Sequence, residues 1–124
     1  MSSHSPTSPM SPESPQQKYD AAGSGVVTFV NRFTVHSAPE EFERVFAEIS
    51  EFMIQQPGFL QYTLSRSIDE EKRDQYINIA LWTDVESWQR AVAHPGFQDH
   101  AKEIRSRTTN AGELYAPRQS YSVT

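Results

Sequence analysis

Residues 26–35, VVTFVNRFTV, combine β-branched and aromatic side chains in an alternating pattern that predicts a β-strand. One face of this strand is apolar except at its centre, and it carries Val27, Phe29, Asn31, Phe33 and Val35. The opposite face is partly apolar as well. We therefore expect helices to cover one side of the sheet and a partner subunit to cover the other.

The following segment predicts an amphipathic helix. Ser37 stands in the position of a capping residue, and Glu40 follows three residues later, as in a capping box. Apolar residues then recur at spacings of three and four, at Phe42, Val45, Phe46, Ile49, Phe52 and Met53. This spacing places them on one side of a helix, which Pro57-Gly58 is expected to end.

The middle of the chain predicts a β-hairpin. Residues 59–68 and 75–83 have the composition of strands, and the polar run 69–74 between them that of a turn. A short turn of this kind connects antiparallel neighbours.

The C-terminal third predicts helical structure followed by a strand. Asp84 can cap a short helix, and His94-Pro95-Gly96 precedes a further helical turn. That turn places four residues on one stripe, namely Phe97, His100, Ala101 and Ile104. Residues 114–123 are expected to form the last strand, in which Pro117 favours an edge position or a bulge.

The order β-α-β-β-α-β predicts a ferredoxin-like α+β sandwich. Such a unit covers only one face of its sheet with helices, and about 100 residues make a modest core. We therefore expect a homodimer that associates through the open face.

The amino-terminal segment differs in composition from the rest. Residues 1–24 contain seven Ser and four Pro, so they cannot bury enough apolar surface to offset their ordering entropy. We interpret them as a disordered tail, and residues 25–124 as one domain. The tail's repeated Ser-Pro pairs suit a solubilising leader or a phosphorylation or docking segment.

Charge and cysteine content exclude several classes of function. The formal net charge of -5 and the lack of a basic run argue against a nucleic-acid partner. The sequence has no cysteine, so disulfides, thiolate nucleophiles and iron–sulfur clusters are excluded. No apolar stretch approaches the roughly 20 residues needed to span a bilayer. A cytoplasmic protein without a membrane partner is the default expectation.

Candidate chemistry comes from polar residues on apolar faces, because the sequence has no short catalytic or metal-binding signature. Asn31 is one such residue. In the predicted third strand, Tyr76, Asn78, Ala80 and Trp82 share a face, and about 13 Å separates the Cα atoms of Asn78 and Trp82. If the first and third strands are neighbours, Asn31 and Asn78 lie on one surface under the helices. A planar polycyclic molecule fits between such groups.

Each of these residues also has an ordinary structural interpretation. A strand asparagine often satisfies backbone groups or an internal water, and Trp82 is typical of a core aromatic residue. His100 on an apolar stripe is typical of a hydrogen-bonded core histidine, while His36 and His94 lie at element ends and suit capping.

Three stretches resemble a known family: VTFVNRFTV, EFERVFAEISEFMIQQPGFLQYTL and YINIALWTDVESWQRAVAHPGFQDHA. They are similar to the antibiotic biosynthesis monooxygenase family, and within it to the cofactor-independent anthrone oxygenases of anthracycline pathways. The likeness runs from about Val27 to Arg118 and excludes the Ser-Pro tail. The motifs VNRFTV and NIALW match this subgroup in detail.

The resemblance implies a dimeric α+β barrel that oxidises a polycyclic anthrone to the anthraquinone with O2, without flavin, haem or metal. It implies catalytic roles for Asn31, Asn78 and Trp82, the positions already singled out by their faces. The residues expected around them make a set of candidate substrate contacts, namely Phe29, Phe33, Phe46, Tyr76 and His100.

The expected chemistry needs no metal. Proton loss from the anthrone gives an enolate, which passes one electron to O2, and recombination gives a hydroperoxide that loses water. Asn31 and Asn78 suit hydrogen bonding to the enolate oxygen, and Trp82 suits steering of a peroxy intermediate or stacking on the substrate. The base is left open between a water and the substrate itself.

Two alternatives stay open at this stage. The family includes haem-degrading enzymes, whose motif is an asparagine, a tryptophan and a histidine. Asn31 and His100 fill two of these places, but the tryptophan position falls near Ala91. The other alternative is a non-catalytic dimeric protein that binds a polyketide intermediate.

Overall fold

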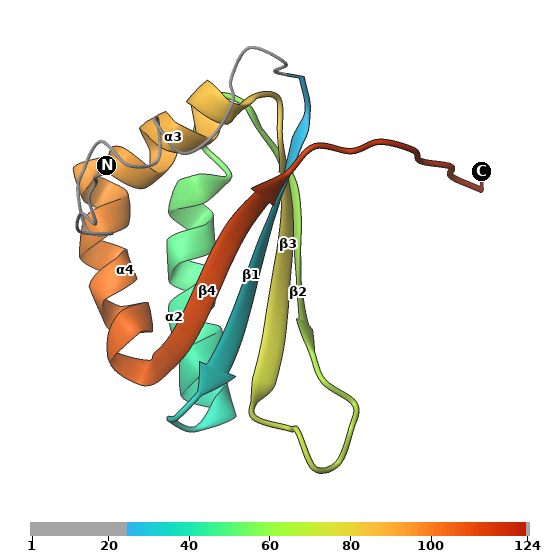
Figure 1. The fold of residues 1–124 in the computed structure, drawn as a ribbon. Helices are drawn as coiled ribbons and strands as arrows, with labels where there is room; N and C mark the ends of the chain where they lie inside the picture. The colour runs from blue at the N-terminus through green and yellow to red at the C-terminus, as the bar shows by residue number, and fades with distance from the viewer. Residues whose placement is uncertain (1–24, 124) are drawn as a thin grey trace, which may run out of the picture.

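The computed structural model describes residues 25–123, so the predicted disordered tail, residues 1–24, lies outside the described residues. The elements in chain order are β1 (Val27–Val35), α2 (Pro39–Met53), β2 (Phe59–Arg66), β3 (Gln75–Trp82), α3 (Val85–Ala93), α4 (Pro95–Arg107) and β4 (Thr108–Tyr115). The helices lie together on one face of the sheet (Figure 1). This confirms the predicted ferredoxin-like α+β fold, with two consecutive helices before the last strand.

The strands form one antiparallel sheet in the order β2-β3-β1-β4. The first and third strands are therefore neighbours at its centre, as the sequence predicts. Their register places Asn31 directly opposite Asn78. The same row continues to Leu64 on β2 and to Gly112 on β4.

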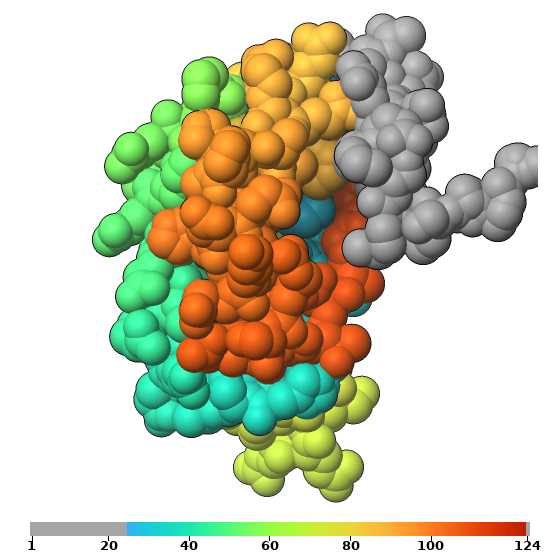
Figure 2. Space-filling view, turned by 90° about the vertical axis from the view of Figure 1, so that its left-hand side faces the viewer, coloured from blue at the N-terminus to red at the C-terminus, as the bar shows by residue number. Residues whose placement is uncertain are grey.

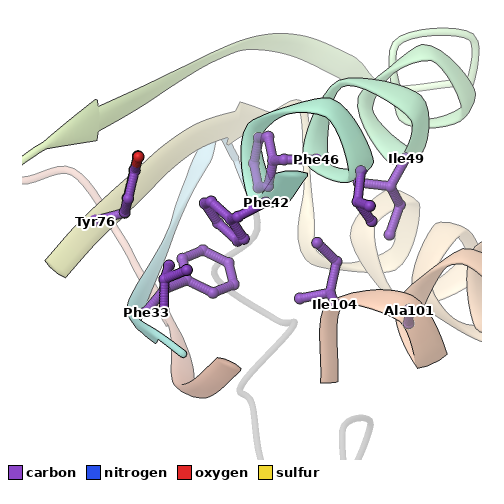
Figure 3. Packing of buried hydrophobic residues seen from close by; sticks show 9 residues of the cluster. Phe33, Phe42, Phe46, Ile49, Tyr76, Ala101 and Ile104 are labelled. Atoms are coloured by element: carbon purple, nitrogen blue, oxygen red, sulfur yellow. The ribbon is translucent and has the colours of Figure 1, made fainter. Parts of the chain in front are cut away.

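Most of the core lies between the sheet and the helices, in two clusters. In the larger cluster, Phe42 and Phe46 of α2 face Phe33 of β1, and Ile104 and Ala101 come from α4 (Figure 3). The smaller cluster consists of Val27, Ala80, Trp82, Val85, Trp88 and Ala91. The apolar side chains that alternate along β1 and those that recur at helical spacing along α2 therefore pack into the same core.

The start of α2 differs from the predicted capping box. Its N-cap residue is Ala38, and no side chain caps it. The Ser37 hydroxyl instead donates to the Ala38 carbonyl oxygen at 3.4 Å. Pro39 begins the helix without a cap, because its φ is already helical and it has no N–H to satisfy.

The other predicted helix boundaries are closer to the structure. The Ser87 N–H donates to the Asp84 carboxylate at 2.7 Å, which confirms Asp84 as the N-cap of α3. The Gly96 N–H donates to Nδ1 of His94 at 2.8 Å, so His94 caps α4. The chain turns between α2 and β2 at Gly58, whose φ of 91° favours glycine.

The prediction of the last strand at residues 114–123 is wrong, because β4 spans Thr108–Tyr115. The chain enters the sheet directly after α4 and pairs with β1 along the whole of β4. The sequence misleads here because Asn110 and Gly112 are residue types depleted in strands. Pro117 lies beyond the ladder, where its missing N–H costs nothing.

No helix within residues 25–123 combines the length and apolar character that crossing a membrane requires.

Candidate active site

A cavity of about 180 Å³ lies between the sheet and the helices. Every described helix and strand contributes to its wall, and most of the lining is aromatic or aliphatic. Arg105 of α4 and Asn110 of β4 belong to the lining and are exposed at the surface. Figure 2 shows the surface hollowed between these two elements, with β1 in blue at the bottom of the hollow. We take this hollow as the mouth of the cavity.

Two asparagine amides lie on the floor of the cavity. Asn31 and Asn78 face each other across β1 and β3, and both line the cavity. The side-chain oxygen of each is buried without a hydrogen-bond partner among the described residues. Burying an amide oxygen in this way is costly unless something binds it. The pair therefore has the character of a binding site for a polar group of a ligand.

Trp82 of β3 also lines the cavity. It is 1% exposed and packs edge-on against Phe59, with 5.2 Å between the ring centroids. It follows Asn78 by four residues on one strand, so both side chains rise from the same face of β3. The strand period places these two groups on one face of the sheet, and both line the cavity.

Three of the predicted substrate contacts also line the cavity, namely Phe29, Phe33 and Phe46. Phe33 and Phe46 pack edge to face, with centroids 5.9 Å apart, and join β1 to α2. Phe29 packs instead against Trp88 of α3 at 5.3 Å. These rings give the cavity an apolar wall that suits a flat aromatic ligand.

Tyr76 and His100, the other two predicted contacts, do not line the cavity. The Tyr76 hydroxyl donates to the Glu43 carboxylate at 2.6 Å, and its ring packs against Phe42. Burial, followed by this hydrogen bond, raises the pKa of Tyr76 to about 12, so the phenol stays protonated. His100 is half-buried on α4. Both share the expected face or stripe but lie beyond the reach of the cavity.

The sequence analysis missed four polar residues of the lining, namely Ser50, Tyr62, Arg105 and Asn110. Arg105 continues the α4 stripe at a spacing of four from Ala101, so helical periodicity alone could have found it. Asn110 escaped because the predicted last strand began too late in the sequence. In the observed β4, Asn110 and Gly112 are two residues apart and therefore lie on the face of the sheet that carries Asn31.

The chemistry of the lining is set by neutral groups. Among the described residues that line the cavity there is no Asp, Glu or His, and the ionisable side chains are Arg105 and Tyr62. Residues 25–123 also hold no group of three His, Cys, Asp or Glu side chains that could bind a metal. The arrangement offers amide hydrogen bonds, aromatic surfaces and one cation at the rim.

Comparison with known proteins gives concordant results. Residues 26–103 match the antibiotic biosynthesis monooxygenase family. Deoxynogalonate monooxygenase from Streptomyces nogalater is 45% identical over 106 residues, which cover 86% of this chain and 88% of the relative.

Solved structures agree with this match. The crystal structure of SnoaB, a cofactor-independent oxygenase from Streptomyces nogalater, is 50% identical with a TM-score of 0.74 and covers 77% of this chain and 96% of its own. A protein from Shewanella loihica is 30% identical with a TM-score of 0.60, and the match covers 78% of this chain and 98% of the other.

Proposed function

Because this chain belongs to the antibiotic biosynthesis monooxygenase family, we propose that it oxidises a polyketide anthrone to the anthraquinone with O2. It is a cofactor-independent monooxygenase, like its Streptomyces relatives. The observation that carries the proposal is the pair Asn31 and Asn78, whose amide oxygens are buried without partners on the floor of an apolar cavity.

The reaction balances without a redox group from the protein. The methylene of an anthrone is acidic for carbon, because proton loss gives an enolate delocalised over both aryl rings. The enolate passes one electron to O2, which gives a substrate radical and superoxide. Their recombination forms a C–O bond, and after protonation the hydroperoxide loses water to leave the quinone. One oxygen atom enters the product and the other leaves as water.

The paired amides suit both charged stages of this sequence. An amide donates through Nδ2 and accepts through Oδ1, so a rotation about Cβ–Cγ changes which group it presents. Asn31 and Asn78 can donate to the enolate oxygen first and accept from the hydroperoxide O–H later. Preorganised donors in a cavity that excludes water stabilise an oxyanion more strongly than water does.

Other lining residues orient the substrate. The rings of Phe29, Phe33 and Phe46 supply flat apolar contacts, and Trp82 adds a further aromatic surface. Arg105 places a cation at the rim, where it suits an anionic oxygen of a substrate side chain. Because the described lining contains no carboxylate or histidine, we assign removal of the methylene proton to a water or to a group of the substrate itself.

The haem-degrading alternative fits this arrangement poorly. Its histidine place, His100, is not part of the cavity lining. Ala91, at its tryptophan place, is buried in the cluster around Trp82 and Trp88. The residues therefore do not gather around one ligand as that motif requires.

We also propose a homodimer in which two sheets meet through the face that the helices leave open. That face carries Val30, Ile77, Ile79 and Leu81 on the two central strands, and Ile79 is 43% exposed. The segment after β4 runs away from the body of the protein (Figure 1), and in it Tyr121 and Val123 are 89% and 86% exposed. Apolar side chains in these positions suit contact with a second copy.

Oxygen uptake tests the proposed function directly. Purified protein is mixed with dithranol, a model anthrone, in the presence of a metal chelator, and quinone formation is followed by absorbance. We expect one O2 consumed for each quinone formed, with no requirement for flavin, haemin or metal. Binding of the anthrone without oxygen uptake would identify a non-catalytic binding protein, and uptake that depends on haemin would identify a haem enzyme.

A further inference from the structure

Gly112 of β4 lies directly opposite Asn31 of β1. A Cβ atom at this position would lie 2.7 Å from Cζ and 2.8 Å from Cε1 of Phe29. Its distance to Cγ of Asn31 would be 3.5 Å. The φ of Gly112 is not positive, so the backbone conformation does not require glycine here. The reason for glycine is space, since the edge of the Phe29 ring occupies the volume of the missing side chain.

The Phe29 ring is enclosed on two further sides. The Trp88 ring packs against it from α3 at 5.3 Å, and Trp88 is itself buried. Leu114 lies opposite Phe29 on β4. A ring pushed off Gly112 therefore cannot move toward α3 or along β4.

The remaining direction leads into the cavity. On the other side of β1, Phe29 is paired with Ala80 of β3, which lines the cavity together with Tyr62 of β2. Ala80 lies between Phe29 and Tyr62 on neighbouring strands, and its small side chain leaves room between their two rings on the cavity side of the sheet. A displaced Phe29 ring would lean over Ala80 and fill part of that room.

We propose that Gly112 is a specificity-determining residue, which sets the width of the cavity beside Asn31 by accommodating the edge of the Phe29 ring. The inference rests on the proposed function for its substrate class, substituted anthrones. Gly112 is not among the lining residues and acts through the position of Phe29. An anthrone with a side chain needs the full width, whereas an unsubstituted ring system needs less.

The test compares two substrates, 1,8-dihydroxyanthrone and the same ring system with a three-carbon side chain. In Gly112→Ala, we expect the ratio of kcat/KM for the substituted over the unsubstituted anthrone to fall by about tenfold or more. Phe29→Leu removes the ring edge and should change the ratio in the opposite direction. In the double variant, Gly112→Ala should have little further effect, because the added methyl no longer meets Cζ and Cε1 of Phe29.

A binding measurement separates this inference from the proposed function. Quenching of tryptophan fluorescence by the two matching anthraquinones reports affinity without turnover, and Gly112→Ala should weaken the substituted quinone selectively. Wild-type protein that oxidises neither anthrone would refute the proposed function. An unchanged ratio in Gly112→Ala would overturn the role of Gly112, and so would an equal loss in the Phe29→Leu background. If Gly112→Ala does not fold, the Phe29 ring has no room to move toward the cavity, and the proposed role of Gly112 is overturned.

Discussion

Asn78 is an unusual buried asparagine, because its amide oxygen, like that of Asn31, has no hydrogen-bond partner among the described residues and lies in a mostly apolar cavity. A structural asparagine would satisfy a neighbouring backbone group, and its loss would leave that group unpaired. Asn78 holds no such group in place. We therefore propose that a bound ligand offsets the cost of burying this amide.

Asn78→Ala should therefore separate activity from stability. We expect kcat for a model anthrone to fall by roughly a hundredfold, as for loss of one oxyanion donor. The midpoint of thermal unfolding should stay close to the wild-type value, because no hydrogen bond within the protein is lost. Oxygen uptake and circular dichroism on the same sample measure both quantities.

The Asn31→Ala variant and the double variant sharpen this test. Two amides that serve one oxygen atom should act non-additively, so the double variant should lose less than the product of the single effects. Full turnover in a folded double variant would show that this face of the sheet is not the active site.

Asn31, Asn78 and Trp82 could be found from the sequence because side chains alternate strictly along a strand. A polar residue among apolar neighbours at a spacing of two must then point inward. The same rule selected Tyr76, but it does not predict how far the cavity extends along the strand. Tyr76 lies outside the cavity, next to Glu43. Periodicity predicts on which face of the sheet a side chain lies, whereas the extent of the cavity depends on how the helices pack on that face.

Among the elements, α2 attaches to the sheet mainly through aromatic contacts. Phe46 is 7% exposed and packs against Phe33, Phe42 and Tyr62, with ring centroids about 6 Å apart. Because it also lines the cavity, one side chain supports both the fold and the wall of the site.

Phe46→Ala should destabilise the protein by roughly 3–5 kcal/mol, the usual cost of truncating a buried phenylalanine. Urea unfolding followed by circular dichroism measures this loss, and Asn78→Ala is the comparison variant with an expected change near zero. A stability loss below about 1 kcal/mol would show that the α2 contact can collapse around the missing ring.

The start of α3 depends on a charged cap. The Ser87 N–H donates to the Asp84 carboxylate, and this hydrogen bond lowers the pKa of Asp84 below its usual value. Asp84→Ala should cost about 0.5–2 kcal/mol at neutral pH. Because the folded-state pKa lies below the unfolded value, the charged form stabilises the fold at neutral pH. That contribution is lost as the pH falls below about 4 through the folded pKa.

Asp84→Asn is the matched control, because asparagine also caps a helix but does not titrate. The free energy of unfolding of wild type minus Asp84→Ala should shrink in acid, whereas the difference between the Asn and Ala variants should stay constant with pH. A wild-type advantage that does not shrink as the pH falls would contradict this account of the cap.

The last strand shows where local sequence preference fails. TTNAGELY contains Asn110 and Gly112, and neither residue type favours a strand. Its position comes from long-range contacts instead, because it pairs with the edge of β1 that β3 does not occupy, and the Phe29 ring covers the glycine. The residue pattern of one segment does not show which other strand that segment pairs with or which side chain packs over its glycine. Because the predicted strand began at residue 114 rather than at Thr108, the sequence analysis also missed Asn110.

At the scale of the whole molecule, the two faces of the sheet differ in how well they are covered. The helices bury one face, while the other keeps an apolar stripe on β1 and β3 at the surface. An exposed apolar stripe of this kind indicates an interaction surface, because soluble monomers rarely expose large contiguous apolar patches. This asymmetry follows from the βαββαβ order, so the sequence alone could predict it.

Ile79→Glu should therefore convert the proposed dimer to a monomer. Ile79 lies near the middle of the open face and is 43% exposed in one chain, so a carboxylate there is readily solvated in a monomer. In a dimer, the same carboxylate would be buried against a second copy without a partner, at a cost of several kcal/mol. Light scattering coupled to size-exclusion chromatography measures the molar mass of each form.

Ala47→Glu provides the matched control, because Ala47 is exposed on α2 in the helical layer, away from the open face. It introduces the same charge and should leave the dimer intact. The Ile79→Glu monomer should still show a folded circular dichroism spectrum, since each chain has its own core between the sheet and the helices. If Ile79→Glu and wild type elute with the same dimeric mass, the open face is not the interface. If wild type itself is monomeric, the proposed assembly is wrong, while the cavity, which is lined from a single chain, is left unaffected.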